Sequence, residues 1–371
     1  MSSPGVNWTS PTTGRPLHFD TPYSLTDGQF ERWPVVDGIP YLRTESEGLV
    51  GLALHELDAG NADAALIALL TDQDPWWPGP ATDLSELQRL VAERDTLTLR
   101  EAMALLRFGP VGDYFAHRWS DPVFLAGLAL MEAHWNAPAT AFELAGGIGH
   151  YARELTRCGV ATTSADIVFS KCWLAKNWVA PEAQYVVFDA KDTWPLGSAR
   201  FDMVLCQDAF YFLPDQAKVA ERLRETAAPD GVLAIGHVHN ASVEGGALGP
   251  AREAAEWAEL FPHARVYDEN ELRAAFADTR APEPSGWVPD AQVEAWSLVE
   301  PDRPAHVIAD GIATPPPARA LLPNPLIGEA GPRWPSDRYA REYGPASTWA
   351  APRGDSAPNR DRRLVDLPER W

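Results

Sequence analysis

The stretch AFELAGGIGHYA, residues 141 to 152, decides how the chain folds, because three glycines lie where an apolar run gives way to a helical pattern. In an open parallel sheet the ligand lies beyond the carboxyl ends of the strands, and a glycine-rich first turn lets that ligand come close to the backbone. The stretch therefore predicts a strand, a ligand-binding turn and a helix, in that order.

Short apolar runs and helical patterns alternate from residue 139 to residue 240. This alternation is typical of a parallel sheet with helices on its faces. The fold class that we expect is α/β, with a doubly wound, mostly parallel, Rossmann-like sheet. The predicted strands are ATAFEL, VATTSA, QYVVF, DMVLC, GVLAIGHV and, near residue 300, VEAWSLVE; the predicted helices are GHYARELTRC, SKCWLAKNW, QAKVAERLRETA and ENELRAAFAD.

The pattern outside this region predicts three further segments. Residues 1–48 form a small β-rich segment that contains a hairpin turn at Asp37-Gly38. Residues 49–135 carry apolar residues at three- and four-residue spacing and form a helical cap. Residues 136–300 form the ligand-binding domain, and residues 301–371 form a proline-rich arm.

Large aromatic side chains continue into this arm, which otherwise lacks periodicity and includes three consecutive prolines at 315–317. A solvated tail seldom carries so many large apolar rings, so we expect the arm to wrap the domain. The rings on which this expectation depends are Trp334, Tyr339, Tyr343, Trp349 and Trp371.

Composition narrows the choice of partners. The formal net charge of −21 opposes binding to a phosphate backbone, so we expect no nucleic acid partner. Three scattered cysteines and the absence of a long apolar run predict a cytoplasmic protein with no membrane partner. The oligomeric state does not follow from the sequence.

Acidic residues at the predicted strand ends distinguish two ligands. The spacing Gly147-x-Gly149-x-x-Ala152, with Asp166 further on, fits a dinucleotide site. However, Glu143 directly precedes the glycines, where an ionised carboxylate repels a pyrophosphate and attracts an ammonium and a sulfonium. With Asp166 and Asp189 ending the next two strands, the acids favour S-adenosylmethionine over NAD.

The sequence resembles the class I S-adenosylmethionine-dependent methyltransferases over roughly residues 125 to 300. The motif from Glu143 to Gly149 is similar to the family's acidic-x-Gly-x-Gly-x-Gly motif, with Ala145 in place of the first glycine. PLGSARFDMVLCQDAFYFLPD resembles the family's fourth-strand motif, and RLRETAAPDGVLAIGHV resembles its fifth strand with the preceding helix. The resemblance implies that the loop holds the methionine part of the cofactor, Asp166 its ribose and Asp189 its adenine. The full expected cofactor set is Glu143, Ala145, Gly146, Gly147, Gly149, Asp166, Asp189, Ala190 and Gln207.

The segment RWPVVDGIPYLR also resembles the end of a small zinc-ribbon-like domain that accompanies some methyltransferases. No cysteine occurs before Cys158, so the metal ligands of that domain are missing and we expect no zinc there. We expect aromatic packing to hold the segment instead, through Phe19, Tyr23, Phe30, Trp33 and Tyr41.

Two histidines in GVLAIGHVHN are the candidate catalytic residues. His237 and His239 are two residues apart, so on an extended strand they face one side, near the expected substrate. Either imidazole can take a proton from a hydroxyl acceptor, with a pKa near 6.5 in a neutral environment. Tyr211, which follows the fourth strand, is the third candidate. Two alternatives stay open. The two histidines could form a metal site together with His150, or one of them could be a hydrogen-bonded residue at the strand end without a catalytic role.

Substrate contacts are expected in YFAHRWSDP, which leads into the domain. Tyr114, His117, Arg118 and Trp119 are the candidates, and Arg118 suits an anionic group. A surface arginine stacked on Trp119 is the alternative. The sequence therefore predicts a methyltransferase that acts at oxygen on a small-molecule or sugar-containing metabolite. An NAD-dependent oxidoreductase and a non-catalytic S-adenosylmethionine-binding protein are the other two hypotheses.

Overall fold

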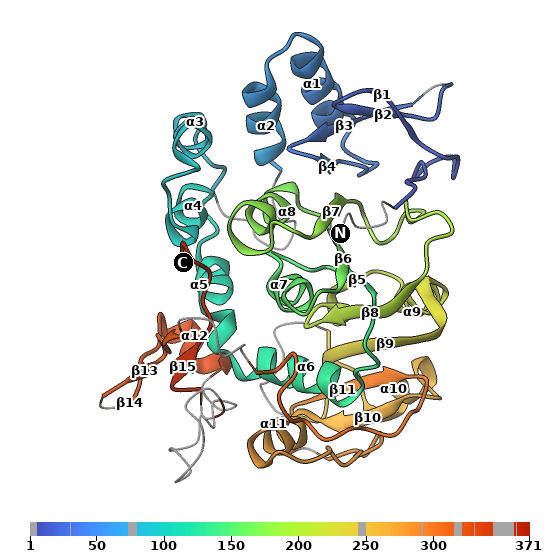
Figure 1. Cartoon of the computed structure of the whole chain (residues 1–371), viewed down its shortest axis with the longest axis vertical. Coiled ribbons are helices and arrows are strands. Elements are labelled where there is room, and N and C mark those ends of the chain that lie inside the picture. Colours follow the sequence, from blue (N-terminus) through green and yellow to red (C-terminus); the bar gives the residue numbers. More distant parts are fainter. Residues whose placement is uncertain are drawn as a thin grey trace. The chain divides into compact units, whose positions relative to one another are not determined.

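The computed structural model describes residues 6–29, 31–72, 80–243, 250–290, 292–314, 321–329, 331–343, 360 and 362–371. The chain folds into two compact units. Figure 1 labels their helices and strands. Unit 1 comprises Met1–Gly112, Thr140–Arg200 and Pro368–Trp371, and unit 2 comprises Asp113–Ala139 and Phe201–Leu367. These units cut across the four segments expected from the sequence, whose boundaries stay a prediction.

A four-stranded antiparallel sheet begins unit 1. Its strands β1 (His18–Thr21), β2 (Ser24–Thr26), β3 (Arg32–Val36) and β4 (Ile39–Pro40) lie in chain order. Asp37 and Gly38 between β3 and β4 both have positive φ, 49° and 70°, as a type I′ hairpin turn requires, so this turn is confirmed.

The aromatic packing expected in this segment is found only in part. Trp33 and Tyr41 are buried, and Tyr23 is half-buried. Phe19 is 60% exposed, so its expected packing role is wrong: it lies on the exposed strand β1, whose side chains have no apolar layer to pack against. Phe30 lies outside the described residues.

Four helices of unit 1 confirm the first part of the expected helical region. They are α1 (Glu47–Asp58), α2 (Ala62–Leu70), α3 (Leu84–Glu93) and α4 (Leu99–Leu105). A capping box begins α4, because Thr98 accepts from the backbone N–H of Glu101 while the Glu101 carboxylate accepts from Thr98. Consecutive helices pack on one another, and α1 also packs on β3.

Three parallel strands form the ligand-binding half of unit 1. They are β5 (Thr140–Leu144), β6 (Ala161–Asp166) and β7 (Gln184–Val187), in the order β5-β6-β7. Helix α7 (His150–Arg157) packs on β6, and α8 (Phe169–Leu174), which continues as a short π-helix over Ala175–Val179, packs on β6 and β7. The carboxyl ends of these three strands, which carry or precede eight of the nine expected cofactor residues, therefore lie along one edge.

Unit 2 contains four further strands of this mostly parallel, Rossmann-like α/β fold. Strands β8 (Phe201–Gln207) and β9 (Ala227–His239) are parallel, and β11 (Ala295–Glu300) and β10 (Arg265–Asp268) follow antiparallel, in the order β8-β9-β11-β10. The helices of this unit include α6 (Pro122–Ala133), α9 (Gln216–Thr226), α10 (Ala254–Leu260) and α11 (Glu269–Asp278). Helices α6 and α11 pack on each other and on β11, and α9 packs on β8 and β9.

Short segments precede and follow these elements. Helix α5 (Pro110–His117) and the 3-10 turns η1 (Arg118–Ser120) and η3 (Phe210–Phe212) carry several candidate site residues. The C-terminal part contains α12 (Asp337–Tyr343) and the short strand pairs β12 (Leu322–Pro323) with β15 (Leu364–Val365) and β13 (Ile327–Gly328) with β14 (Gly331–Pro332).

The described parts of the C-terminal arm pack as expected. Tyr339 and Leu326 are buried together, with Trp334 packed against them, all within unit 2. Trp371 lies in unit 1 under the guanidinium of Arg100, 4.9 Å from its ring centroid. Trp349, the side chain of Tyr343 and the prolines at 315–317 lie outside the described residues.

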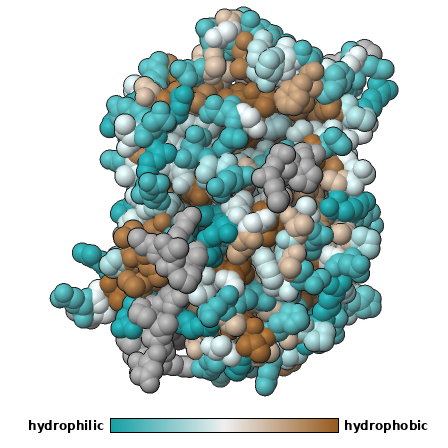
Figure 2. Space-filling model, in the orientation of Figure 1, coloured by the Kyte–Doolittle hydropathy of each residue, from teal (hydrophilic) through white to brown (hydrophobic). Residues whose placement is uncertain are grey.

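Most of the face shown in Figure 2 is hydrophilic or intermediate, with apolar patches between. The large apolar side chains that are exposed among the described residues include Phe19, Leu52, Leu84 and Val307. No helix in the described parts of the chain has both the length and the apolar character needed to cross a bilayer.

Arg370 fastens the C-terminal residues to the rest of unit 1, and we predict that Arg370→Ala destabilises the fold. Its guanidinium donates to the carbonyls of Arg94 and Asn177 at 2.7 and 2.8 Å and stacks 5.0 Å from the ring centroid of Trp178. The loss of these charged hydrogen bonds should lower the free energy of unfolding by about 2 kcal/mol. Urea titration measures it, with the exposed neighbour variant Glu369→Ala as the control. Equal stability of the two variants would contradict the prediction.

Candidate active site

The glycine loop between β5 and α7 has a backbone that favours glycine. Gly147 and Gly149 have φ of 56° and 83°, in the left-handed region. Ala145 also has a φ of 56°, so the alanine that replaces the family's glycine keeps the glycine-like conformation at a cost of about 1–2 kcal/mol. A Cβ on Gly146 would lie 2.1 Å from Oγ of Ser164, which leaves no room for a side chain there.

Glu143, at the end region of β5, is fully buried behind this loop. Its Oε2 accepts a hydrogen bond of 2.9 Å from the hydroxyl of Ser164. Burial, with a smaller contribution from Asp166, raises the pKa of Glu143 to about 8. The carboxyl group is therefore mostly protonated at neutral pH without a bound cation, and repulsion of a pyrophosphate applies only to its ionised form.

Asp166 ends β6 and connects the second strand to the loop. Its Oδ2 accepts from the backbone N–H of Gly147 and its Oδ1 from that of Val168, both at 3.0 Å. Nζ of Lys171 lies 3.8 Å from Oδ1. The carboxylate thus holds the glycine loop in place. It lies at the position where the resemblance to methyltransferases implies contacts with the ribose of the cofactor.

Asp189 and Ala190 follow β7 along the same edge. The side chain of Asp189 accepts from the backbone N–H of Lys191 at 3.0 Å and lies 3.5 Å from Nζ of that lysine. Ala190 is buried, and its carbonyl accepts from the indole of Trp194. Unit 1 therefore brings eight of the nine expected cofactor residues to consecutive strand ends of one sheet.

A small pocket opens to solvent beside these strand ends in unit 1. Val168, Ser170 and Lys171 line it from the segment after β6, and Lys171 is the residue that pairs with Asp166. Leu70 of α2 and Leu106, directly after α4, line it from the helical region. The helical region of unit 1 therefore forms part of its wall.

Gln207, the ninth expected cofactor residue, ends β8 in unit 2. Its Nε2 donates to the carbonyl of Ala234 at 3.1 Å, and its Oε1 would lie 1.9 Å from a Cβ on Gly236. The amide therefore occupies the space over β9 that the glycine leaves free. Its cofactor contact stays a prediction.

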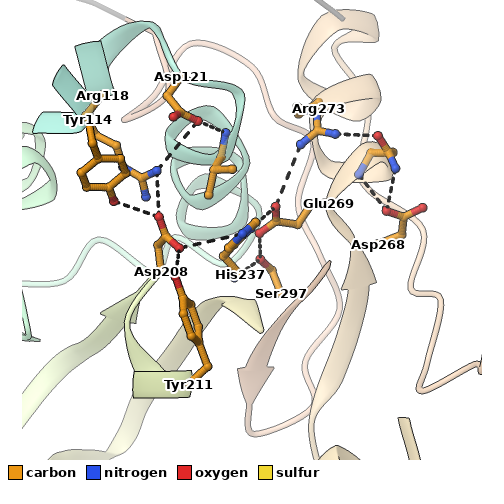
Figure 3. A network of polar contacts seen from close by, with 12 residues as sticks. Tyr114, Arg118, Asp121, Asp208, Tyr211, His237, Asp268, Glu269, Arg273 and Ser297 are labelled. Carbon is orange, nitrogen blue, oxygen red and sulfur yellow. Dashed lines mark hydrogen bonds and ion pairs between the residues drawn. The ribbon is translucent and has the colours of Figure 1, made fainter. Parts of the chain in front are cut away.

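A buried polar network lies at the carboxyl ends of β8 and β9, within unit 2 (Figure 3). Asp208, with a φ of 53°, directs its carboxylate to the hydroxyls of Tyr114 and Tyr211, at 2.8 and 2.9 Å, and to Nη1 of Arg118 at 3.1 Å. Burial opposes the charge of Asp208, but Arg118 and His237 outweigh it and hold its pKa below the ordinary value. Asp208 is thus ionised, and its carboxylate holds Tyr114, Tyr211 and Arg118 in place.

His237 continues this network toward α11. Its Nδ1 lies 2.9 Å from Oε2 of Glu269 and its Nε2 lies 3.8 Å from Oδ1 of Asp208. Burial opposes protonation, but the two carboxylates outweigh burial and raise the pKa of His237 to about 9. The expected pKa near 6.5 applied to a neutral environment, and this environment is anionic.

His239 lies close by but differs in charge. The ring centroids of His237 and His239 are 4.7 Å apart, so the two side chains do lie together, although the backbone at His237 is left-handed rather than extended. Burial and the charge of His237 lower the pKa of His239 to about 4. Its buried Nε2 has no hydrogen-bond partner among the described residues. Within those same residues, no group of three or more histidine, cysteine, aspartate or glutamate side chains is arranged to hold a metal ion.

The expected substrate residues lie in or beside the network. Arg118 is only 2% exposed and stacks 5.0 Å from the ring centroid of Tyr114, so the alternative of a surface arginine on Trp119 is wrong. Its charge is balanced by that of Asp208. The pairing is not evident from the sequence, because the two residues are 90 positions apart. Trp119 is buried, and Nδ1 of His117 bonds the carbonyl of Asp113 at 2.9 Å, one helical turn earlier.

Sequence reasoning missed two members of the network. Glu269 and Ser297 lie 32 and 60 residues after His237, on α11 and β11. Glu269 follows Asp268, the helix cap of α11, and therefore looks like an ordinary first-turn acid. The residues around it, Asp268-Glu269-Asn270-Glu271, are all polar, so the sequence gives no signal that Glu269 is buried.

Comparison with known proteins gives one family match. Residues 142–235 match the family model described as a methyltransferase domain. No curated protein matches the sequence. A TehB-like SAM-dependent methyltransferase from Corynebacterium glutamicum is 16% identical, with a TM-score of 0.37, over 53% of this chain and 100% of that one.

Two further solved structures are similar over part of the chain. Phosphoethanolamine N-methyltransferase 2 from Haemonchus contortus, in complex with S-adenosyl-L-methionine, is 16% identical over 47% of this chain and 46% of that one, with a TM-score of 0.35. The amino pentose methyltransferase CalS10 from Micromonospora echinaspora, with SAM bound, is 22% identical over 34% and 56%, with a TM-score of 0.29. The chain spans about half the length of these two proteins, and such low TM-scores carry no argument about the acceptor.

The matched segment contains the glycine loop, Asp166, Asp189, the last three residues of β5 and the strands β6 to β8. The fold is thus the Rossmann-like α/β fold of methyltransferases, and the expected fold class is confirmed. The protein is an enzyme with methyltransferase activity, and its cofactor is S-adenosylmethionine.

We predict that Asp166→Asn lowers the affinity for S-adenosylmethionine at least tenfold, about 1.4 kcal/mol. Asparagine keeps an acceptor for the N–H of Gly147 but loses the charge that strengthens hydrogen bonds from ribose hydroxyls. Isothermal titration measures the dissociation constant, with Glu182→Gln, an exposed acid before β7, as the control. An unchanged dissociation constant in a folded Asp166→Asn variant would remove Asp166 from the site.

Proposed function

We propose that this enzyme methylates a hydroxyl oxygen of a small-molecule or sugar-containing metabolite. The observation that carries the proposal is the buried imidazole of His237 at the carboxyl end of β9, with its Nε2 directed toward Asp208. A hydroxyl oxygen must lose its proton as the methyl group arrives. A positioned imidazole is the commonest group that takes such a proton.

S-adenosylmethionine supplies the methyl group, and the carbon–sulfur bond breaks as the carbon–oxygen bond forms. The residues of the chain have to hold the acceptor in line, exclude water and receive the proton. We assign the proton to Nε2 of His237 in its neutral form. His239 is neutral at pH 7 and serves as a hydrogen-bonding group, and Tyr211, whose ring centroid is 4.2 Å from that of His239, completes the catalytic set.

The cofactor set stays as expected from the resemblance, and the strand-end positions in unit 1 support it. Gln207 is the member with the least support, because its amide already bonds β9. We propose that Tyr114, His117, Arg118 and Trp119 shape the acceptor site, with Arg118 acting through Asp208 rather than on an anionic group. The helices within 49–135 are proposed to cover the site.

The two other hypotheses have less support. The methyltransferase-domain match favours methyl transfer over hydride transfer to NAD. A binding protein without turnover has no need for a histidine held in a buried anionic environment. On composition we also propose a cytoplasmic enzyme that acts on neither nucleic acid nor a membrane, since its formal charge is −21 and its three cysteines are scattered along the chain.

We also propose that residues 1–48 derive from a zinc-ribbon-like domain that holds no zinc. The four-stranded antiparallel sheet and the confirmed turn at Asp37-Gly38 support the similarity, and the missing cysteines remove the ligands. Elemental analysis of the purified protein should find less than stoichiometric zinc. Stoichiometric zinc that disappears when residues 1–45 are deleted would contradict this prediction.

For the proposed reaction we predict that His237→Gln reduces turnover by about 10²–10⁴ while the affinity for the cofactor changes little. Only the neutral imidazole accepts a proton, and the pKa of His237 is about 9, so the rate should rise with pH up to about pH 9. The measurement is a pH–rate profile at saturating cofactor, once isotopically labelled methyl donor has identified the acceptor. His239→Ala is the companion variant, and near wild-type turnover in both would eliminate histidine base catalysis.

A further inference from the structure

His237 occupies a bulge in the pairing of β9 with β11. Trp296 pairs with Val238 and Leu298 pairs with Ile235, so Ser297 alone faces the two residues between them, Gly236 and His237. The φ of His237 is 58°, an uncommon and strained value for a residue with a side chain. Bulges of this kind change the direction of a side chain near active sites.

Ser297 and Glu269 close a ring of hydrogen bonds around this strained residue (Figure 3). The backbone N–H of His237 donates to Oγ of Ser297 at 3.3 Å, and that hydroxyl donates to Oε1 of Glu269 at 2.8 Å. The other oxygen of Glu269 lies 2.9 Å from Nδ1 of His237. Backbone and side chain of His237 are therefore both fixed by one carboxylate, directly and through Ser297.

We propose that Glu269 is the positioning residue of the methyl-transfer reaction. An ionised carboxylate only accepts hydrogen bonds, so Nδ1 of His237 must carry the proton and Nε2 is left to take the proton of the acceptor. Glu269 touches neither acceptor nor cofactor in this assignment and acts through His237. The inference rests on the proposed role of His237, but its test is separate.

Glu269 dominates over the other charged groups that face His237. Asp208 is 3.8 Å away and already accepts from two tyrosines and Arg118, whereas Glu269 bonds the ring directly. Arg273, one helical turn after Glu269, lies 4.0 Å from its Oε2 and supports its ionised form. The titratable groups around His237 are Glu269 of α11, Asp208 after β8, Glu294 before β11, Asp121 before α6, Tyr211 of η3 and His239 of β9.

The decisive experiment is an NMR titration of the histidine rings in the full chain, which needs no acceptor. Glutamine at position 269 keeps an acceptor for Nδ1 but removes the charge, so Glu269→Gln should lower the pKa of His237 by about one pH unit or more. Glu269→Asp keeps the charge and should retain most of the elevation. Glu271→Gln is the matched control, because it removes the same charge from α11 at a residue that contacts Arg280.

Ser297→Ala provides a second variant in case Glu269→Gln does not fold. It removes the hydroxyl that links the backbone N–H of His237 to Oε1 of Glu269, so the contact between Glu269 and the His237 ring should loosen and the pKa of His237 should fall by a smaller amount. Once the methyl acceptor is identified, Glu269→Gln should also move the acidic limb of the pH–rate profile to lower pH. An unchanged pKa of His237 in Glu269→Gln, or in Ser297→Ala where the first variant is unfolded, overturns the inference. Unchanged turnover in His237→Gln instead overturns the proposed function, whatever the pKa of His237 is in Glu269→Gln.

Discussion

The ionised carboxylate of Asp208 is the group on which the polar interior of unit 2 depends. It follows β8 in a left-handed conformation and is contacted by side chains from α5, η1, η3 and β9. Its partners Tyr114, Arg118 and Tyr211 supply donors to both of its oxygens. Removal of one partner from a buried ion pair leaves an uncompensated charge, at a cost of about 3–5 kcal/mol. Arg118 and Asp208 are therefore positioned by each other, which explains why an arginine can be buried in this segment.

The network also explains why two neighbouring histidines differ in charge. Arg118 pairs with Asp208 and His237 pairs with Glu269, so each of these buried charges has an opposite charge beside it. A second imidazolium would be buried beside the charged ring of His237, and both effects oppose it. His239 therefore stays neutral, and its Nε2 remains available as a hydrogen-bonding atom. The carboxylates reach one ring and not the other, so an H-x-H sequence here produces two distinct groups rather than a symmetric pair.

The strands and most helices were predictable because their signals are local. The alternation of apolar runs with helical patterns located β5 to β9, and the confirmed turn at Asp37-Gly38 needed only two residues. Strand β10 and helix α10 were missed because four and seven residues are too short for a periodic signal. The partners of His237 were missed for a different reason: the fold brings Glu269 and Ser297 to it over long stretches of chain, and one bulge decides where its ring points. Local patterns predict elements, whereas charge pairing in a core depends on tertiary structure.

The burial of Glu143 changes the reason why this loop prefers a cationic ligand. With a pKa raised to about 8 by burial, the carboxyl group is mostly neutral at pH 7, so it neither attracts nor repels a ligand at a distance. A cation that approaches the loop lowers that pKa and stabilises the ionised form, whereas a pyrophosphate raises it further. We therefore expect the proton on Glu143 to be released for a sulfonium or ammonium and retained for an anion. We expect discrimination to arise when the ligand is bound and the carboxylate forms next to it, in a buried position where a charge pair interacts more strongly than in water.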